Sequence, residues 1–450
     1  MRNVTIPRAE EVGAAQLSRV AFTEICERLI RARSLVDDPH HQSRKQGSAM
    51  ARVLHEGLHA VERQLDSLRR LTFGDDSGDA GSVLAGLGIA AAGLTQVQAH
   101  LHYLGGRLPL GTADLFVRKL VAEGMPIPIP TLCPVDVRHP SAGDVGSEFR
   151  ERLSAAGLTA HAPERDAPVL TIPTIDVLDP LAWPALLYPL ASVVVSRRRI
   201  ASRLREPSSL DHDKVRRLCV AGVAARFVGE PTYAACAVQA LVDRLVDGAS
   251  GLDLDVLAQA TDRYVVPVAG GDDRTPTDFY RSLLQEQRSG GTRLSARQPS
   301  LNSLDGAHET ALLDDYFLSA DIPLPDLPTE EDIGELVRLL ADGRPINALA
   351  PELPADFAER LDAGIDAPRF YAVLGDAGER PCSLAAILAG GLRYKLRHSL
   401  PLCGALMASA ASWSNALTPY AAHVHERSAL LLQSIEAAYV QQMFSARRDE

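Results

Sequence analysis

A run of fifteen uncharged residues in the middle of the chain, Leu181 to Val195, constrains the fold more than any other feature. It contains Pro184 and Pro189, and three arginines, Arg197 to Arg199, follow it closely. Such a segment is a membrane span, a buried helix or the helix of a former catalytic site. These three alternatives predict different folds and different functions.

The composition is that of an ordinary globular protein. The chain has 450 residues, of which 46% are hydrophobic and 23% are charged, and it is long enough for two or three domains. Its net charge is −11. A general nucleic-acid binder relies on an excess of Lys and Arg to contact phosphates, so we expect no nucleic-acid partner.

The cysteines and the N-terminus predict a cytoplasmic protein. No C-x-x-C pair is present, and the thiols are scattered over Cys26, Cys133, Cys219, Cys236, Cys382 and Cys403. This spacing is typical of buried thiols in a reducing compartment. Residues 1–16 also lack the apolar core that a secretory signal needs.

Two other uncharged windows bear on membrane insertion. Residues 82–95 fall short of the roughly 20 apolar residues that a span requires. Residues 400–422 are long enough but rich in Ser, Asn, Gly and Pro. We therefore expect no contact with a membrane.

Helical periodicity dominates the chain. Apolar residues recur three and four apart in 20–36, 48–73 and 80–108, which predicts an N-terminal helical hairpin or bundle over residues 1–125. A core with few strands is expected over 126–317, because 126–140 and 167–180 are β-like. A C-terminal helical region should follow over 318–450, with helices at 332–341, 354–363, 383–398 and 423–444. The predicted fold class is mostly α.

The sequence HEGLH at 55–59 matches the H-E-x-x-H pattern of zinc peptidases. Residues i and i+4 share one helix face, so His55 and His59 could hold one Zn²⁺ while Glu56 polarises its water. This interpretation predicts a zinc-dependent metallopeptidase.

Helix geometry favours a second interpretation of the same segment. A core-facing stripe is predicted from the spacing of Leu54, Leu58, Val61, Leu65 and Leu68. His55 and His59 then fall on its flank with Glu62 and Asp66, as on a solvated face. No recognisable motif supplying a third ligand follows, so the surface-helix interpretation is preferred.

The uncharged run itself resembles part of a known family. In bacterial zincin-like metallopeptidases of the HExxH type, a strand and a D-P-x-x-W-P-x-L lead-in run straight into H-E-x-x-H. The present chain has a β-like stretch at 167–180, and it matches the lead-in at Asp179, Pro180, Trp183, Pro184 and Leu186.

The resemblance breaks at the metal ligands. The H-E-x-x-H positions fall on 188–192, where Tyr188 and Ser192 replace the two histidines and Pro189 replaces the catalytic Glu. The resemblance therefore implies a degenerate member that holds no zinc. Pro189 should also kink or end its helix, because proline in a helix interior removes a hydrogen bond.

Further phrases extend the resemblance over residues 165–440. Residues 227–233 (FVGEPTY) are similar to the family's L-L-G-P-x-Y phrase, but 214–226 lack the acidic ligand that precedes it. Residues 381–396 are similar to S-x-x-E-I-L-N-A-G-W, with Ala386 for Glu and Leu392 for Trp. Residues 430–440 are similar to the family's closing helix.

The resemblance implies a non-catalytic, pseudo-metallopeptidase scaffold that binds a protein partner in a bacterial multi-component system, without a cofactor. The alternative is the zinc metallopeptidase that uses His55, Glu56 and His59. A helical adaptor of other ancestry would be favoured if residues 173–246 lacked a strand leading into two packed helices.

Overall fold

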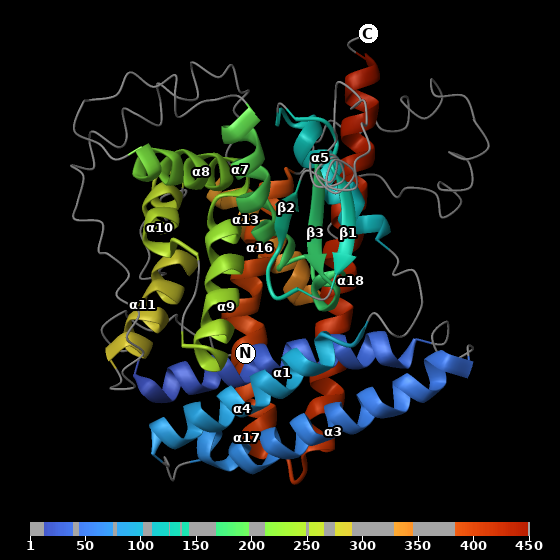
Figure 1. Ribbon diagram of the computed structural model, residues 1–450, viewed down its shortest axis with the longest axis vertical. Coiled ribbons are helices and arrows are strands. Elements are labelled where there is room, and N and C mark those ends of the chain that lie inside the picture. Colours follow the sequence, from blue (N-terminus) through green and yellow to red (C-terminus); the bar gives the residue numbers. More distant parts are fainter. Residues whose placement is uncertain are drawn as a thin grey trace, which may run out of the picture.

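The computed structural model describes residues 13–38, 45–74, 79–101, 110–125, 127–135, 137–143, 168–197, 212–248, 252–264, 275–289, 328–344 and 383–448. These residues form a mostly helical protein with one small sheet, as Figure 1 shows. The predicted mostly α class is confirmed. The predicted helix at 354–363 and the proposed boundary after residue 317 lie outside the described residues.

The described elements follow one another along the chain in three groups. The first comprises α1 (Ala14–Asp37), α3 (Lys45–Phe73), α4 (Ala80–Gln98) and α5 (Gly111–Ala122). The second comprises β1 (Thr131–Val135), β2 (Ser141–Gly143), β3 (Val169–Pro173), η3 (Thr174–Asp176), η4 (Trp183–Leu186), α7 (Leu187–Arg197), α8 (His212–Val228), α9 (Glu230–Val246), α10 (Leu254–Asp262) and α11 (Pro276–Ser289). The third comprises α13 (Glu330–Asp342), α16 (Leu384–Tyr394), η6 (Lys395–Ser399), α17 (Leu400–Ser409) and α18 (Trp413–Arg448).

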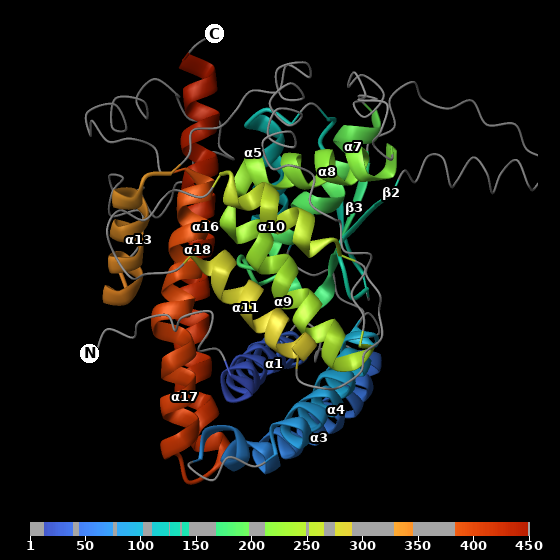
Figure 2. The same cartoon turned by 90° about the vertical axis from the view of Figure 1, so that its left-hand side faces the viewer.

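Helices α1, α3 and α4 form a layer at one end of the molecule, as both Figure 1 and Figure 2 show. Asp79 caps α4 by accepting hydrogen bonds from the backbone N–H groups of Gly81 and Ser82. A Cβ atom on Gly57 would lie 2.9 Å from Val97 Cγ2, so the glycine allows α3 and α4 to approach closely. The predicted helical hairpin is therefore present as α3 and α4.

The sheet is small and mixed, with strand order β1-β3-β2. Strand β3 pairs in parallel with β1, with Leu132 opposite Leu170, and antiparallel with β2, with Ala142 opposite Leu170. Leu170 and Ile172 are fully buried on β3. The predicted strand at 167–180 is confirmed over its first half.

Strand β3 leads through two short 3₁₀ helices into α7. Trp183 opens η4 and is completely buried, and its indole Nε1 donates a hydrogen bond of 2.9 Å to the Asp176 carbonyl. Pro184 sits in the first turn of η4, where its missing N–H costs nothing. The lead-in is therefore anchored by a side chain that the resemblance had singled out.

The prediction that Pro189 kinks or ends a helix was wrong. Helix η4 ends at Leu186 and α7 begins at Leu187, so Pro189 is the third residue of a new helix. The first turn of a helix has no intrahelical acceptor for its N–H groups, so a proline is tolerated there. Pro189 is therefore no evidence for or against a catalytic helix.

Other element boundaries also differ from expectation. Helix α4 ends at Gln98, ten residues before the predicted end, and α18 begins at Trp413, ten residues before the predicted start. Helix α5 was not anticipated. Pro419 lies inside α18, and the helix continues through it.

The largest hydrophobic core of the described residues includes side chains from all three predicted regions, from Leu17 in α1 to Ala438 in α18. The three regions thus share one core, and their boundaries remain predictions. Among the described helices, α4 is the one that is long and apolar enough to cross a membrane by length and composition, and 44% of its most apolar window is buried in the protein.

We predict that Trp183→Phe lowers the free energy of unfolding by about 2 to 3 kcal/mol, because it removes a buried hydrogen bond and leaves a void. The matched control is Trp413→Phe, since the indole Nε1 of the buried Trp413 has no hydrogen-bond partner in the described part of the chain. Urea denaturation should show the larger loss for Trp183→Phe. Equal losses would mean that the bond to Asp176 contributes nothing.

Candidate functional site

Helix α7 carries three positions that the sequence resemblance aligned with a zinc motif. Tyr188, Pro189 and Ser192 are all half-buried. Tyr188 and Ser192 lie four residues apart, so they share one face of α7, and α7 packs directly against α8. The structure therefore places Tyr188 and Ser192 on a helix that lies next to α8.

The environment of Tyr188 is that of a neutral phenol. Burial, with a smaller contribution from the nearby charge of Asp253, raises its pKa to about 12, while Arg217 opposes the rise. Arg217 projects from α8 and pairs with Asp253, with 3.2 Å between Nη1 and Oδ2. An arginine–carboxylate pair thus lies beside α7, close to Tyr188.

These residues do not fit the zinc ion that an H-E-x-x-H motif holds. Protein zinc sites are built from thiolate, imidazole and carboxylate ligands. Tyr188 keeps its proton, Ser192 offers a hydroxyl and Pro189 has no side-chain donor. The carboxylate of Asp253 is already neutralised by Arg217, whose positive charge also repels a divalent cation.

The HEGLH segment lies on α3, with its apolar stripe in the core as predicted. Leu54, Leu58, Val61, Leu65 and Leu68 are all buried. Glu56 and His59 are exposed, and His55 is half-buried. Glu62 differs from the expectation of a solvated flank, because it is buried and paired with Arg33.

Both histidines of this segment have carboxylate partners. His55 Nε2 lies 3.2 Å from Asp37 Oδ1, and His59 Nδ1 lies 2.8 Å from Glu62 Oε2. Their rings stack with centroids 6.4 Å apart. Among the described residues, no group of three or more His, Cys, Asp or Glu side chains is placed to hold a metal ion. The use of His55, Glu56 and His59 by a zinc enzyme remains a prediction.

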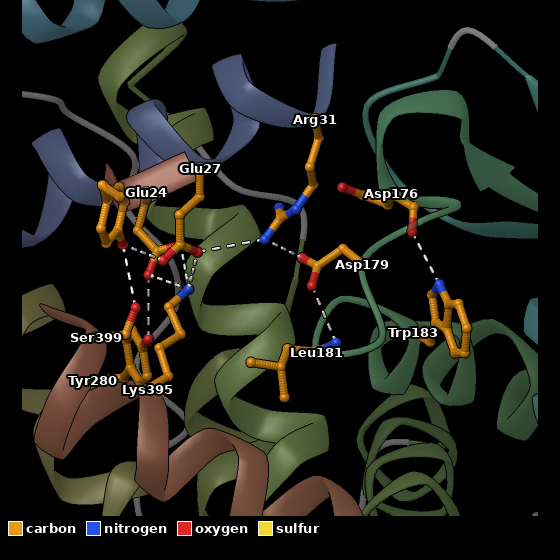
Figure 3. A network of polar contacts seen from close by, with 11 residues as sticks. Glu24, Glu27, Arg31, Asp176, Asp179, Leu181, Trp183, Tyr280, Lys395 and Ser399 are labelled. Atoms are coloured by element: carbon orange, nitrogen blue, oxygen red, sulfur yellow. Dashed lines mark hydrogen bonds and ion pairs between the residues drawn. The ribbon is translucent and has the colours of Figure 1, made fainter. Parts of the chain in front are cut away.

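A buried network of charged side chains, shown in Figure 3, joins α1 to the C-terminal helices. At its centre the Lys395 ammonium lies between Glu24 and Glu27 of α1, 2.9 Å from Glu24 Oε1 and 2.7 Å from Glu27 Oε2. Two tyrosine hydroxyls donate hydrogen bonds to the same carboxylates: Tyr280 donates to Glu24 at 3.4 Å, and Tyr420 donates to Glu27 at 2.7 Å. We call these residues, with Arg31, Asp176 and Asp179, the ionic network.

Electrostatics in the ionic network favour the charged forms of Lys395 and Glu27. Burial would lower the pKa of Lys395, but Glu24 and Glu27 raise it above its usual value. Burial would raise the pKa of Glu27, but the charges of Lys395 and Arg31 lower it overall. The pKa of Glu24 stays raised, because burial outweighs the effect of Lys395. Lys395 is thus a fixed cation and not a nucleophile.

The ionic network reaches the lead-in to α7 through Arg31. Its guanidinium lies 3.4 Å from Glu27 Oε2 and 2.8 Å from Asp179 Oδ2. The other oxygen of Asp179 accepts a hydrogen bond of 3.2 Å from the backbone N–H of Leu181. Asp179 therefore fixes the turn before η4 and ties it to α1.

A second buried group connects α9, α13 and α16. The guanidinium of Arg393 lies 2.6 Å from Glu330 Oε2 and 3.6 Å from Glu230 Oε2. Burial raises the pKa of Glu230 to about 7, with Arg393 opposing and Glu330 adding to the rise. Glu230 is therefore poised to gain a proton near neutral pH.

The sequence offered little signal for either group. Glu24 and Lys395 are 371 residues apart, and a Glu at i and another at i+3 is ordinary on a solvated helix. One local signal exists, because Lys395 opens η6, a π-helical turn inside an otherwise α-helical segment. Such turns occur frequently at functional sites, but this one is not readable from residue types alone.

An apolar groove of about 480 Å³ runs between α3 and α4. It is flanked by Val53 and Ile89, which are 59% and 65% exposed, and Gly57 and Gly93 also line it. Exposed apolar surface of this kind is common on proteins that bind other proteins.

Comparison with known proteins gave no match: no family model, no curated protein and no solved structure resembles this chain.

We predict that Glu230→Gln weakens the pH dependence of stability. A raised carboxyl pKa means that the folded protein binds the proton more tightly, so this contribution is full below about pH 4.5 and lost as the pH rises through about 7. Between pH 5 and 8 the wild type should lose unfolding free energy as Glu230 gives up its proton. This loss should be smaller in Glu230→Gln by on the order of 2 to 3 kcal/mol. The exposed Glu331→Gln is the control, and equal pH profiles for wild type and Glu230→Gln would show that another group is responsible.

Proposed function

We propose that the chain is a metal-free, zincin-like scaffold that acts by binding a protein partner and not by hydrolysing peptide bonds. The observation that carries the proposal is the set of side chains at the ligand positions of α7. Tyr188 and Ser192 share one helix face, and the adjacent helix presents Arg217, paired with Asp253. A cation and two hydroxyl groups replace the imidazoles and carboxylate that zinc requires.

The path of the chain supports the zincin-like part of the proposal. Strand β3 leads through η3 and η4 into α7, and α7 packs against α8. A strand followed by two packed helices is the arrangement that separates this proposal from a helical adaptor of other ancestry. Because fold alone does not define activity, the assignment rests on the side chains at the site.

Binding of a protein is the activity that remains for such a scaffold. The net charge of −11 disfavours nucleic acid as the partner. The apolar groove between α3 and α4 provides surface of the type that protein interfaces use. We further propose a cytoplasmic location, a role in a bacterial multi-component system and no metal cofactor.

A graft of the missing ligands tests the proposal. The triple variant Y188H/S192H/R217E places two imidazoles at i and i+4 of α7 and a carboxylate on α8. If α7 and α8 have zincin-like geometry, the variant should bind about one Zn²⁺ per chain, as measured by titration calorimetry and elemental analysis. The control Y188F/S192A should bind none.

Circular dichroism separates a failed graft from a failed fold. A variant with the helical spectrum of the wild type that takes up no zinc would contradict the zincin-like geometry. Peptide hydrolysis by the wild-type protein that chelators abolish would contradict the metal-free assignment.

A further inference from the structure

A small polar cavity lies against the ionic network. Its volume is about 30 Å³, and its wall is formed by α1, the lead-in to α7, α9, α11 and α16–η6. Among the polar side chains that line it are Glu24, Asp176, Gln239, Tyr280 and Lys395. The cavity is independent of the proposed zincin-like site, because none of the three ligand positions of α7 lines it.

Two atoms in this wall have no hydrogen-bond partner among the described residues. They are Oδ1 of Asp176 and Nε2 of Gln239. The two side chains are 3% and 4% exposed, so bulk water does not satisfy them. A buried polar atom without a partner is costly, and such atoms in native proteins are normally satisfied by an ordered molecule.

The chemistry of the two atoms selects the ligand. A carboxylate oxygen accepts a hydrogen bond and an amide nitrogen donates one, so the ligand must be both donor and acceptor. A cation in the cavity would face Arg28, Arg31 and Lys395, and an anion would face Glu24 and Asp179. A neutral molecule avoids both repulsions.

The volume of the cavity also favours a small neutral molecule. A cavity holds a water molecule when its volume exceeds about 10–15 Å³, and the polar cavity is larger than this but too small for an organic ligand. We propose that the polar cavity is an internal water site, in which an ordered water molecule donates a hydrogen bond to Asp176 Oδ1 and accepts one from Gln239 Nε2.

This water joins the lead-in to α7 with the core helix α9. Asp176 belongs to η3, in the lead-in to α7, and Gln239 belongs to α9 in the core. The bound water extends the ionic network across the cavity to α9. It holds the carboxylate of Asp176 in place, while the backbone carbonyl of the same residue accepts the hydrogen bond from the Trp183 indole.

The direct test is a crystal structure of the wild-type protein at a resolution that shows ordered waters. A density peak within hydrogen-bond distance of both Asp176 Oδ1 and Gln239 Nε2 supports the proposal. An empty cavity, or a peak whose contacts and anomalous signal identify a metal cation or an anion, overturns it.

A cavity-filling variant gives a second test in solution. Ala235 lines the cavity from α9. If water fills the site, Ala235→Val displaces it and leaves Asp176 Oδ1 and Gln239 Nε2 without a hydrogen-bond partner. The midpoint of urea unfolding should then fall. If the site is dry, the added methyl groups fill a void and raise the midpoint, which would overturn the proposal.

The background variant Gln239→Met separates the loss of water from the effect of valine on helix formation. The methionine side chain is of similar length but has no amide donor. The water in this background therefore satisfies only Asp176 Oδ1. Ala235→Val should then lower the midpoint less in Gln239→Met than in the wild type. Equal shifts in the two backgrounds would mean that no water bridges the amide.

Discussion

The contact of Lys395 with Glu24 and Glu27 is the interaction on which the arrangement of the chain depends. It joins the first described helix to a turn near the C-terminus, and all three side chains are buried. Removing one partner of a buried ion pair costs about 3–5 kcal/mol, because the other charge is left without compensation. The hydroxyls of Tyr280 and Tyr420 satisfy remaining lone pairs, which is the condition for such a group to be tolerated in a core.

The ionic network also explains how two residues of the lead-in to α7 are positioned. Asp179 bonds Arg31 and the backbone of Leu181, and Trp183 is buried and bonds the Asp176 carbonyl. Both residues position the lead-in. Under the proposed function, Tyr188 and Ser192 occupy the positions that hold the metal in an active zinc peptidase.

Periodicity and local rules predicted much of the fold. The buried stripe of α3 and strand β3 follow from spacing and residue type. The restart of the helix at Leu187 was missed, because a 3₁₀ segment and an α-helix share the same apolar pattern. The burial of Glu62 and the ionic network were missed for another reason: their partners are on other helices, and a charged residue on a helix face is read as exposed until its partner is known.

The central claim is that Tyr188, Pro189 and Ser192 of α7 hold no metal and that the protein acts by binding a partner. Elemental analysis of the full-length protein, purified without added metal, tests it most directly, with His55→Ala measured in parallel. The account predicts far less than about one Zn²⁺ per chain in both samples, because neither α7 nor α3 offers a complete ligand set in the described residues. About one tightly bound Zn²⁺ per wild-type chain would contradict the account, and its loss in His55→Ala would place the metal at the HEGLH segment.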